Sequence, residues 1–291
     1  EIAPSDWSSD VCSSDLVMAS FMLGTVASIA TVLVSILSTK ELEPTPEELA
    51  ELRAHKTGFV GTLKEIWEAI VEMPVQLRKL ALVYLFQWYA MNCYWQYVSL
   101  SVGESIFGAT NALKEADPDR YKTLFEQATA WTGLVNGAYN VVTFCVAFAL
   151  VVLAKRHGAK FVHTTCLLLA AVGLAFFPHI TDKYLLFVPI IGLGIAWASI
   201  LGVPYIMAVR MIPSTRYGVY MGIINMMIVI PMLIQTVTFG TVYKLIGDHP
   251  GNAITFAAVL LALAAIAMLW IKEPPIVKDV DDLSEPVPAE N

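Results

Sequence analysis

The sequence predicts an all-α membrane protein with seven transmembrane helices. Of its 291 residues 57% are hydrophobic and only 15% are charged, whereas roughly one quarter of the residues of a soluble domain are charged. The clearest apolar segments, 184–209 and 217–242, flank a short basic turn at 210–216 and contain no Asp, Glu, Lys, Arg or His. Each is longer than the ~20 residues that a helix needs to cross a bilayer.

Apolar segments of this kind recur along the chain, and their flanking charges indicate an orientation. Lys and Arg number 13 in the loops 40–79, 154–160 and 210–216 together with the C-terminal tail, against 5 in the alternate loops. The positive-inside rule therefore places the first group and the C-terminus in the cytoplasm. The seven predicted spans are 16–38, 80–102, 128–153, 161–177, 184–209, 217–242 and 253–271, of which the fourth is the shortest.

The N-terminal residues 1–15 are polar and do not fit the apolar run that follows them. Residues 6–16 closely resemble the translation of a common sequencing adaptor, so we expect 1–15 to be non-native and the natural chain to begin near Val17. The predicted organisation is then a first helix at 16–38, a cytoplasmic loop at 39–79, a six-helix bundle at 80–272 and a tail at 273–291. The tail is rich in Pro and acidic residues, which predicts disorder.

The cytoplasmic loop contains two capping boxes, at 45–48 (TPEE) and at 62–65 (TLKE), each of which predicts the start of a helix. After the second box, apolar residues recur with helical spacing through Val71. This pattern predicts an amphipathic helix that lies on the membrane face or on the cytoplasmic ends of the spans. The acidic first helix better suits a solvated connector.

Polar and aromatic residues form stripes within several predicted spans. In the second span Trp88, Asn92, Trp95 and Gln96 share one helical face. Because an amide is costly in hydrocarbon, this face is expected to point toward protein or water. The candidate substrate-binding residues are Trp88, Asn92, Trp95 and Gln96, with Asn136 and Asn140 of the third span, Trp197 and Tyr205 of the fifth, and Asn225 of the sixth.

These residue types suit a neutral polyol such as a sugar. Indole and phenol rings stack on its CH faces, and Asn and Gln amides both donate and accept hydrogen bonds. The alternative is that the polar groups only join helices to one another, as they often do in membranes. For a single residue both interpretations stay open, whereas the Trp88 face taken as a whole favours a cavity.

Glycine and proline are frequent in the fifth and sixth spans. Small residues let helix backbones approach closely, and proline bends helices. We therefore expect these two spans to supply movement in a transport cycle. The candidate hinge and packing residues are Gly194, Gly202, Pro204, Gly218, Gly222 and Pro231.

Several functions lack the residues that they require. We expect no ionisable side chain in the core of a span, so that a coupling carboxylate has to come from elsewhere. The cysteines and histidines show no metal-ligand spacing, and the acidic run 279–282 suits a solvated tail. We therefore predict no cofactor, no metal, no nucleic-acid partner and no enzymatic activity, with a sugar and the lipid bilayer as partners.

Three stretches together resemble a known family. Residues 86–90 (FQWYA), residues 194–198 (GIAWA) continuing to Tyr205, and residues 218–222 (GVYMG) continuing to Pro231 are similar to the C-terminal half of sugar:proton symporters. These are the sucrose-transporter-like branch of the major facilitator superfamily, near the glycoside-pentoside-hexuronide symporters. The resemblance covers about residues 17–273.

The resemblance implies twelve spans in two bundles, with the seven predicted spans as spans six to twelve of a truncated protein. It also implies symport of a di- or oligosaccharide with a proton or cation that couples through the missing N-terminal half, in a cell membrane, here a bacterial inner membrane. The stretch 155–160 (KRHGAK) resembles a short basic loop of the superfamily but lacks its acidic partner. The alternative function is a non-transporting sugar sensor or scaffold with the same fold.

Overall fold

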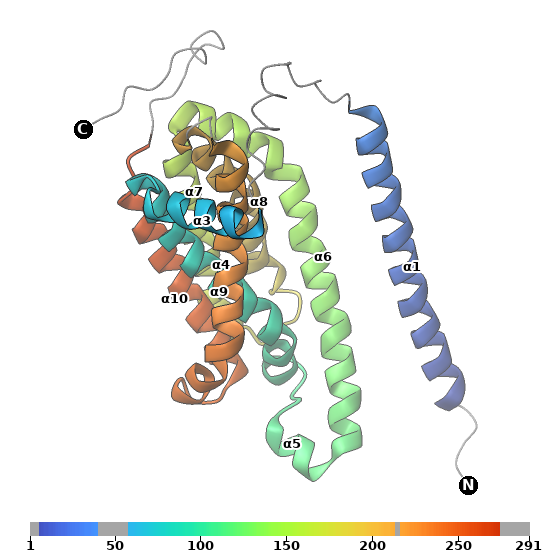
Figure 1. Cartoon of the computed structure of the whole chain (residues 1–291). Helices are drawn as coiled ribbons and strands as arrows, with labels where there is room; N and C mark the ends of the chain where they lie inside the picture. Colours follow the sequence, from blue (N-terminus) through green and yellow to red (C-terminus); the bar gives the residue numbers. More distant parts are fainter. Residues whose placement is uncertain (1–5, 40–57, 213–215, 274–291) are drawn as a thin grey trace. The chain divides into compact units, whose positions relative to one another are not determined.

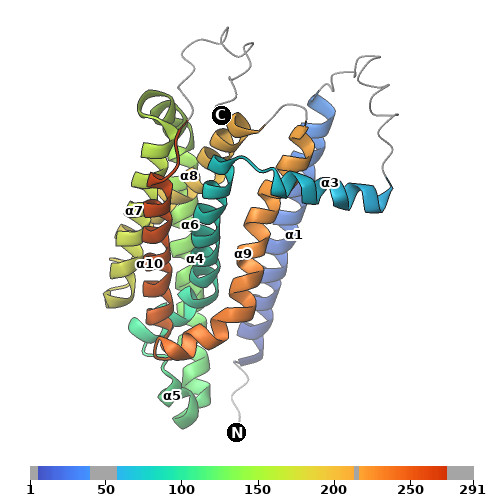
Figure 2. The same ribbon diagram turned by 60° about the vertical axis from the view of Figure 1, so that its left-hand side comes forward.

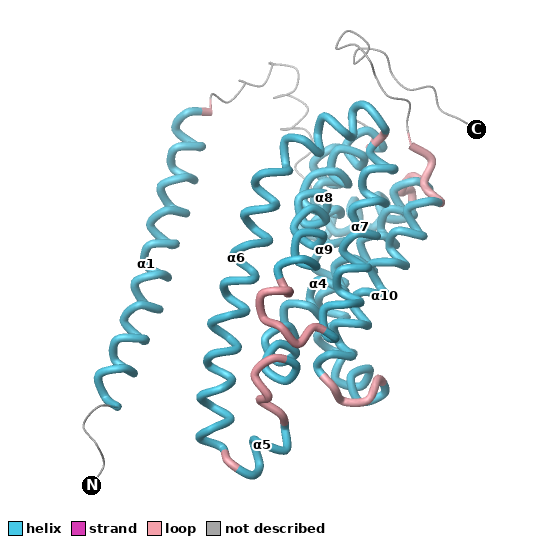
Figure 3. Tube along the Cα trace, turned by 180° about the vertical axis from the view of Figure 1, so that it is seen from behind, coloured by secondary structure: helices cyan, strands magenta, loops and turns pink. Residues whose placement is uncertain are grey.

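A computed structural model of the chain describes residues 6–39, 58–212 and 216–273. Within these residues 88% are helical and no strand occurs (Figure 3). The predicted all-α fold is therefore confirmed. The chain divides into two units, Glu1–Gly61 and Thr62–Asn291, which we describe separately.

The first unit contains one long helix, α1 (Asp6–Ser38). It begins inside the adaptor-like segment, ten residues before the predicted boundary at residue 16. The hydroxyls of Thr25 and Thr31 donate to the carbonyls of Phe21 and Ala27, which satisfies these polar groups within the helix. The capping box at 45–48 lies outside the described residues.

The second unit is a bundle of helices (Figure 1). Each predicted span from 80–102 onward overlaps one of its long helices, so these segments are helical, although several of the predicted ends differ. The elements are α3 (Phe59–Val71), α4 (Val75–Ser105), α5 (Asn111–Ala116), α6 (Pro118–His157), α7 (Ala159–Phe176), the 3-10 helix η1 (Phe177–His179), α8 (Phe187–Met211), α9 (Tyr217–Leu245) and α10 (Pro250–Leu269).

In the described part of the chain, six helices are long and apolar enough to cross a membrane: α1, α6, α7, α8, α9 and α10. The protein is thus a multi-pass membrane protein. The second predicted span, now α4, is not among the six, although it has 31 residues. It contains Gln87, Asn92 and Gln96, and these polar side chains lower its mean hydropathy.

Helix α4 lies at the centre of the contacts: it packs against α6, α8, α9 and α10, and α7 packs against both α8 and α10 (Figure 2). The α7–α8 contact is close because glycines lie on both sides of it. A Cβ atom built on Gly173 would lie 2.7 Å from the carbonyl oxygen of Pro189, and one built on Gly192 would lie 2.9 Å from that of Leu169. Helix α9 packs mainly on α4.

Helix α3 runs across the direction of the bundle helices (Figures 1 and 2). It begins at Phe59, so the predicted start at Thr62 is wrong, and Thr62 lies inside the helix. Of the apolar residues that predicted an amphipathic helix, Trp67 and Val71 are exposed, and Ala69 of the same helix is fully buried. The loop after α3 is joined to the start of α9 by an ion pair of 2.7 Å between Glu72 and Arg216.

Two helix starts differ from the prediction because local capping decides them. Helix α5 was not predicted; the hydroxyl of Thr110 accepts a hydrogen bond from the amide of Leu113 and caps it. Asp117 caps α6 in the same way, with Pro118 in the first turn, so this helix begins ten residues before the predicted residue 128. The additional turns contain charged residues, such as Arg120, that a hydropathy pattern excludes from a span.

At the other end of the bundle, α7 and α10 cap one another. The Glu273 carboxylate accepts hydrogen bonds from the amides of Ala159 and Lys160, where a negative charge stabilises the start of α7. The Lys160 ammonium in turn donates to the carbonyls of Leu269 and Ile271, at 2.7 and 2.8 Å. Glu273, which the predicted tail includes, is therefore part of the fold, and its carboxylate bonds to backbone amides at the end of the basic loop 155–160.

Candidate functional site

Three predicted site residues form one aromatic cluster where α4 meets α8. The ring centroids of Trp88 and Trp197 lie 5.7 Å apart, those of Trp95 and Trp197 lie 5.3 Å apart, and both pairs meet edge to face. Trp88 and Trp95 are 6.5 Å apart. Such pairs contribute about 0.5–1.5 kcal/mol each beyond the area that they bury. Trp88 is buried, whereas Trp95 and Trp197 are half-buried and remain partly accessible.

Two further predicted residues, Asn92 and Gln96, belong to a chain of amides between α4 and α9. The amide nitrogen of Asn92 donates to Oε1 of Gln235 at 2.6 Å, and Nε2 of Gln235 donates to Oε1 of Gln96 at 3.1 Å. Gln235 is fully buried and Asn92 nearly so, whereas Gln96 is exposed. For Asn92 these contacts support the helix-joining alternative, and Gln96 stays open to a ligand.

The remaining predicted residues form hydrogen bonds within or between α4, α6, α8 and α9. Tyr94 of α4 donates to Oδ1 of Asn136 of α6 at 2.8 Å. Tyr205 of α8 donates to Oδ1 of Asn225 of α9, also at 2.8 Å. Asn140 is exposed and donates to the carbonyl of Asn136 in its own helix. The nine predicted residues are therefore distributed over α4, α6, α8 and α9, and eight of them are linked across helices.

The predicted glycines differ in their surroundings. A Cβ atom built on Gly194 would lie 2.7 Å from the carbonyl oxygen of Tyr139 and 2.8 Å from Cβ of Val142, so α6 and α8 touch here. Around Gly202, Gly218 and Gly222 no atom of the described residues lies within 4 Å of such a Cβ.

The two predicted hinge prolines lie inside helices that continue past them. Pro204 is in α8 and Pro231 is in α9, and both side chains are buried. A proline has no backbone N–H, so the carbonyls four residues earlier, at Ile200 and Met227, lose their usual helical partners. Both helices thus carry a point of weakened backbone bonding on the side of the bundle that holds the candidate site.

Helices α6 and α9 carry the same exposed stripe. On α6 it consists of Gly133, Gly137 and Asn140, and on α9 of Gly218, Gly222 and Asn225, with identical spacing. All six residues are exposed, and the four glycines have open space around them within the described part of the chain. Glycines four residues apart are typical of faces on which membrane helices pack.

The expectation that no span has an ionisable side chain in its core is wrong at α7. His163 lies in the second turn of α7 and is fully buried. Its Nε2 lies 3.1 Å from Oε1 of Gln87, which can only accept, so Nε2 donates and Nδ1 accepts from the Ser199 hydroxyl at 2.8 Å. The imidazole thus joins α4, α7 and α8 through neutral partners. Its place inside the predicted span 161–177 was the signal that could have identified it.

No model of a known protein family matches the chain, and a search of curated proteins finds no match either. The family resemblance drawn from the three motifs therefore stays a prediction.

Proposed function

We propose that this chain is the C-terminal half of a secondary active transporter of the major facilitator type. Its substrate is a di- or oligosaccharide, and transport is coupled to a proton or another cation through a second helical bundle. The observation that carries the proposal is the tryptophan cluster of Trp88, Trp95 and Trp197, which lies between two helices and next to the amide chain.

The accessible parts of this cluster fit the chemistry of a sugar. Trp95 and Trp197 are half-buried, so ring surface is left on which the CH face of a sugar can stack. The exposed amides of Gln96, Asn140 and Asn225 can donate and accept hydrogen bonds to hydroxyl groups. All of these groups are neutral, which favours a neutral polyol over a charged substrate.

The repeated stripes on α6 and α9 support the need for a second bundle. In chain order α6 follows α4 and α9 follows α8, so each is the second helix of a set of three. Such transporters are built from structural repeats whose substrate site lies between bundles. A second bundle that packs on Gly133, Gly137, Gly218 and Gly222 would enclose the candidate site between the two halves.

A transport assay tests this proposal. We expect the complete chain 1–291, reconstituted in liposomes with an inward proton gradient, to accumulate no labelled sucrose, maltose or trehalose, because one bundle cannot alternate access. Reconstituted together with an N-terminal bundle encoded upstream, it should accumulate one of them. Concentrative uptake by the chain alone would refute the half-transporter, whereas saturable binding without uptake by the two bundles would identify a sensor.

A substitution at the cluster tests the site within the same assay. We expect Trp95→Ala in the two-bundle protein to raise the half-saturating sugar concentration about tenfold, which corresponds to about 1.4 kcal/mol of lost stacking. Trp270→Ala, at the exposed end of α10, is the matched control and should leave it unchanged. Unchanged affinity and rate in both Trp95→Ala and Asn92→Ala would remove this face from the site.

A further inference from the structure

Three buried hydrogen-bond donors that find no partner among the described residues lie on one turn of α4. They are the Tyr84 hydroxyl, Nε2 of Gln87 and Nε1 of Trp88. Tyr84 and Gln87 are 0% exposed and Trp88 is 6% exposed. An unpaired buried donor costs about 1–3 kcal/mol. Most buried polar groups in proteins are paired, so three exceptions on a single turn require an explanation.

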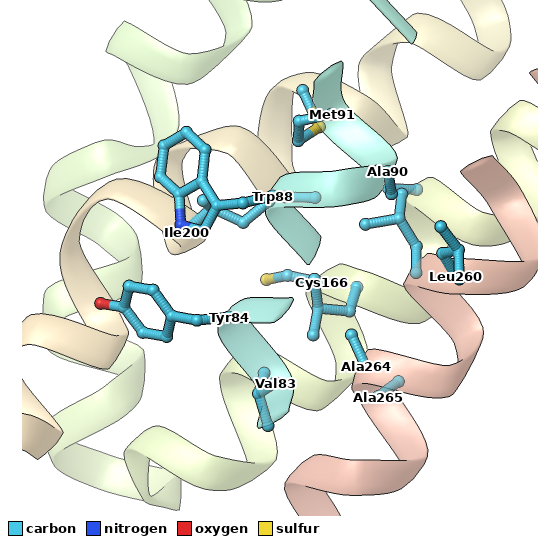
Figure 4. Close-up of a cluster of buried hydrophobic side chains, with 14 of the residues drawn as sticks. Val83, Tyr84, Trp88, Ala90, Met91, Cys166, Ile200, Leu260, Ala264 and Ala265 are labelled. Carbon is cyan, nitrogen blue, oxygen red and sulfur yellow. The ribbon is translucent and has the colours of Figure 1, made fainter. Parts of the chain in front are cut away.

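Two of these donors face the contact between α4 and α8. Tyr84 and Trp88 are four residues apart and therefore lie on the same side of the helix. Figure 4 shows the Tyr84 hydroxyl and the Trp88 indole nitrogen projecting to the same side of α4, away from Leu260 and Ala264 of α10. The ring of Trp88 contacts that of Trp197 on α8.

Helix α8 contributes a backbone acceptor next to this contact. Pro204 cannot donate to the carbonyl of Ile200, which thus lacks its usual helical partner. Ile200 is buried and lies one turn after Trp197, whose ring touches Trp88. A hydroxyl group both donates and accepts, so it can satisfy donors on α4 and an acceptor on α8 at once.

We propose that Tyr84 and Trp88 donate hydrogen bonds to a hydroxyl oxygen of the bound sugar. The binding site then extends one helical turn beyond the tryptophan cluster, toward the Val75 end of α4. This inference rests on the proposed function and adds Tyr84, which the sequence did not single out, as a specificity-determining residue. Both donors are buried in the structure, so the sugar reaches them only when α8 moves away from α4. Pro204 is the point at which the backbone hydrogen bonding of α8 is weakest.

Removal of the Tyr84 hydroxyl separates a binding role from a structural one. We expect Tyr84→Phe to raise the Kd for sugar about 3–10-fold, the effect of one lost neutral hydrogen bond. Its thermal unfolding temperature should not fall, because the lost hydroxyl has no hydrogen-bond partner in the described part of the chain. The measurement is a titration of the two-bundle protein in nanodiscs with sucrose, maltose and trehalose, followed by tryptophan fluorescence and paired with thermal unfolding.

The matched control is Tyr89→Phe, the same chemical change one turn along the same helix. The Tyr89 hydroxyl already bonds to Thr238 of α9 at 2.9 Å, so its loss should lower the unfolding temperature and leave the Kd within twofold. As a second measurement, one monodeoxy analogue of the bound sugar should bind wild type more weakly by a larger factor than Tyr84→Phe does, because it loses the bonds from both Tyr84 and Trp88. Against the Tyr84→Phe variant, the same analogue should lose less affinity than it loses against wild type.

An unchanged Kd in Tyr84→Phe overturns the inference. If the unfolding temperature falls as well, the Tyr84 hydroxyl forms a structural bond inside the protein. If the unfolding temperature also stays the same, the hydroxyl binds no ligand. In that case sugar binding by wild type keeps the proposed function intact. If wild type binds none of the three sugars, the proposed function itself fails, and the Tyr84 inference fails with it.

Discussion

Replacing Gly194 by alanine is expected to lower the free energy of unfolding by about 2–3 kcal/mol, a large effect for one methyl group. The added Cβ would lie 2.7 Å from the backbone oxygen of Tyr139 and 2.8 Å from Cβ of Val142. Neither atom belongs to the end of a flexible side chain, so α6 and α8 would have to separate. Separation would also weaken the hydrogen bond of 2.8 Å from the Thr143 hydroxyl to the Gly194 carbonyl.

Gly202→Ala on the same helix is the control for this prediction. No atom of the described residues lies within 4 Å of its added Cβ. Alanine is also the better helix former, so this variant should be stabilised by up to about 1 kcal/mol. Thermal unfolding of both variants in detergent measures the difference. Equal stabilities would mean that α6 and α8 do not touch at Gly194.

The second large effect is expected at the amide chain. Asn92→Leu should lower the free energy of unfolding by about 2–3 kcal/mol, because it leaves Oε1 of the fully buried Gln235 without its donor. Gln235→Leu should cost a similar amount. The double variant should recover a large part of the loss, since two apolar side chains in place of both partners leave no unpaired amide at this contact.

A double-mutant cycle measures this coupling, with Asn140→Leu as the control. Asn140 is exposed and bonds only to a carbonyl of its own helix, so its replacement should change stability by less than about 0.5 kcal/mol. Additive losses in the cycle would contradict a direct Asn92–Gln235 bond. Sugar binding that disappears in a double variant of restored stability would show that Asn92 also contacts the ligand.

Much of the bundle could be predicted from local patterns. Apolar segments of about 20 residues rarely form any structure other than a membrane helix. The predicted spans accordingly overlap α1, α4 and α6 to α10. The helical period likewise placed Trp88, Asn92 and Trp95 on one face. These patterns predicted the helix ends less well, because the caps at Thr110 and Asp117 depend on single side chains within charged stretches.

The candidate site was predicted only in part, and the misses share a cause. His163 holds a buried network together, yet it does not belong to a stripe of polar residues on its own helix. Tyr84 resembles an ordinary core aromatic until its hydroxyl is found to have no partner. The glycine pattern was also ambiguous, because close contact at Gly194 and open space at Gly202 have the same local spacing.

By itself the sequence determined that this is an α-helical membrane protein, which segments form its long helices, and which side chains are polar within them. These properties depend on hydropathy and helical period over about 20 neighbouring residues. Only the tertiary structure decided which of those polar groups are paired and which are not. The partners lie far apart in the chain, as Asn92 and Gln235 do at a separation of 143 residues, and only packing brings them within hydrogen-bonding distance.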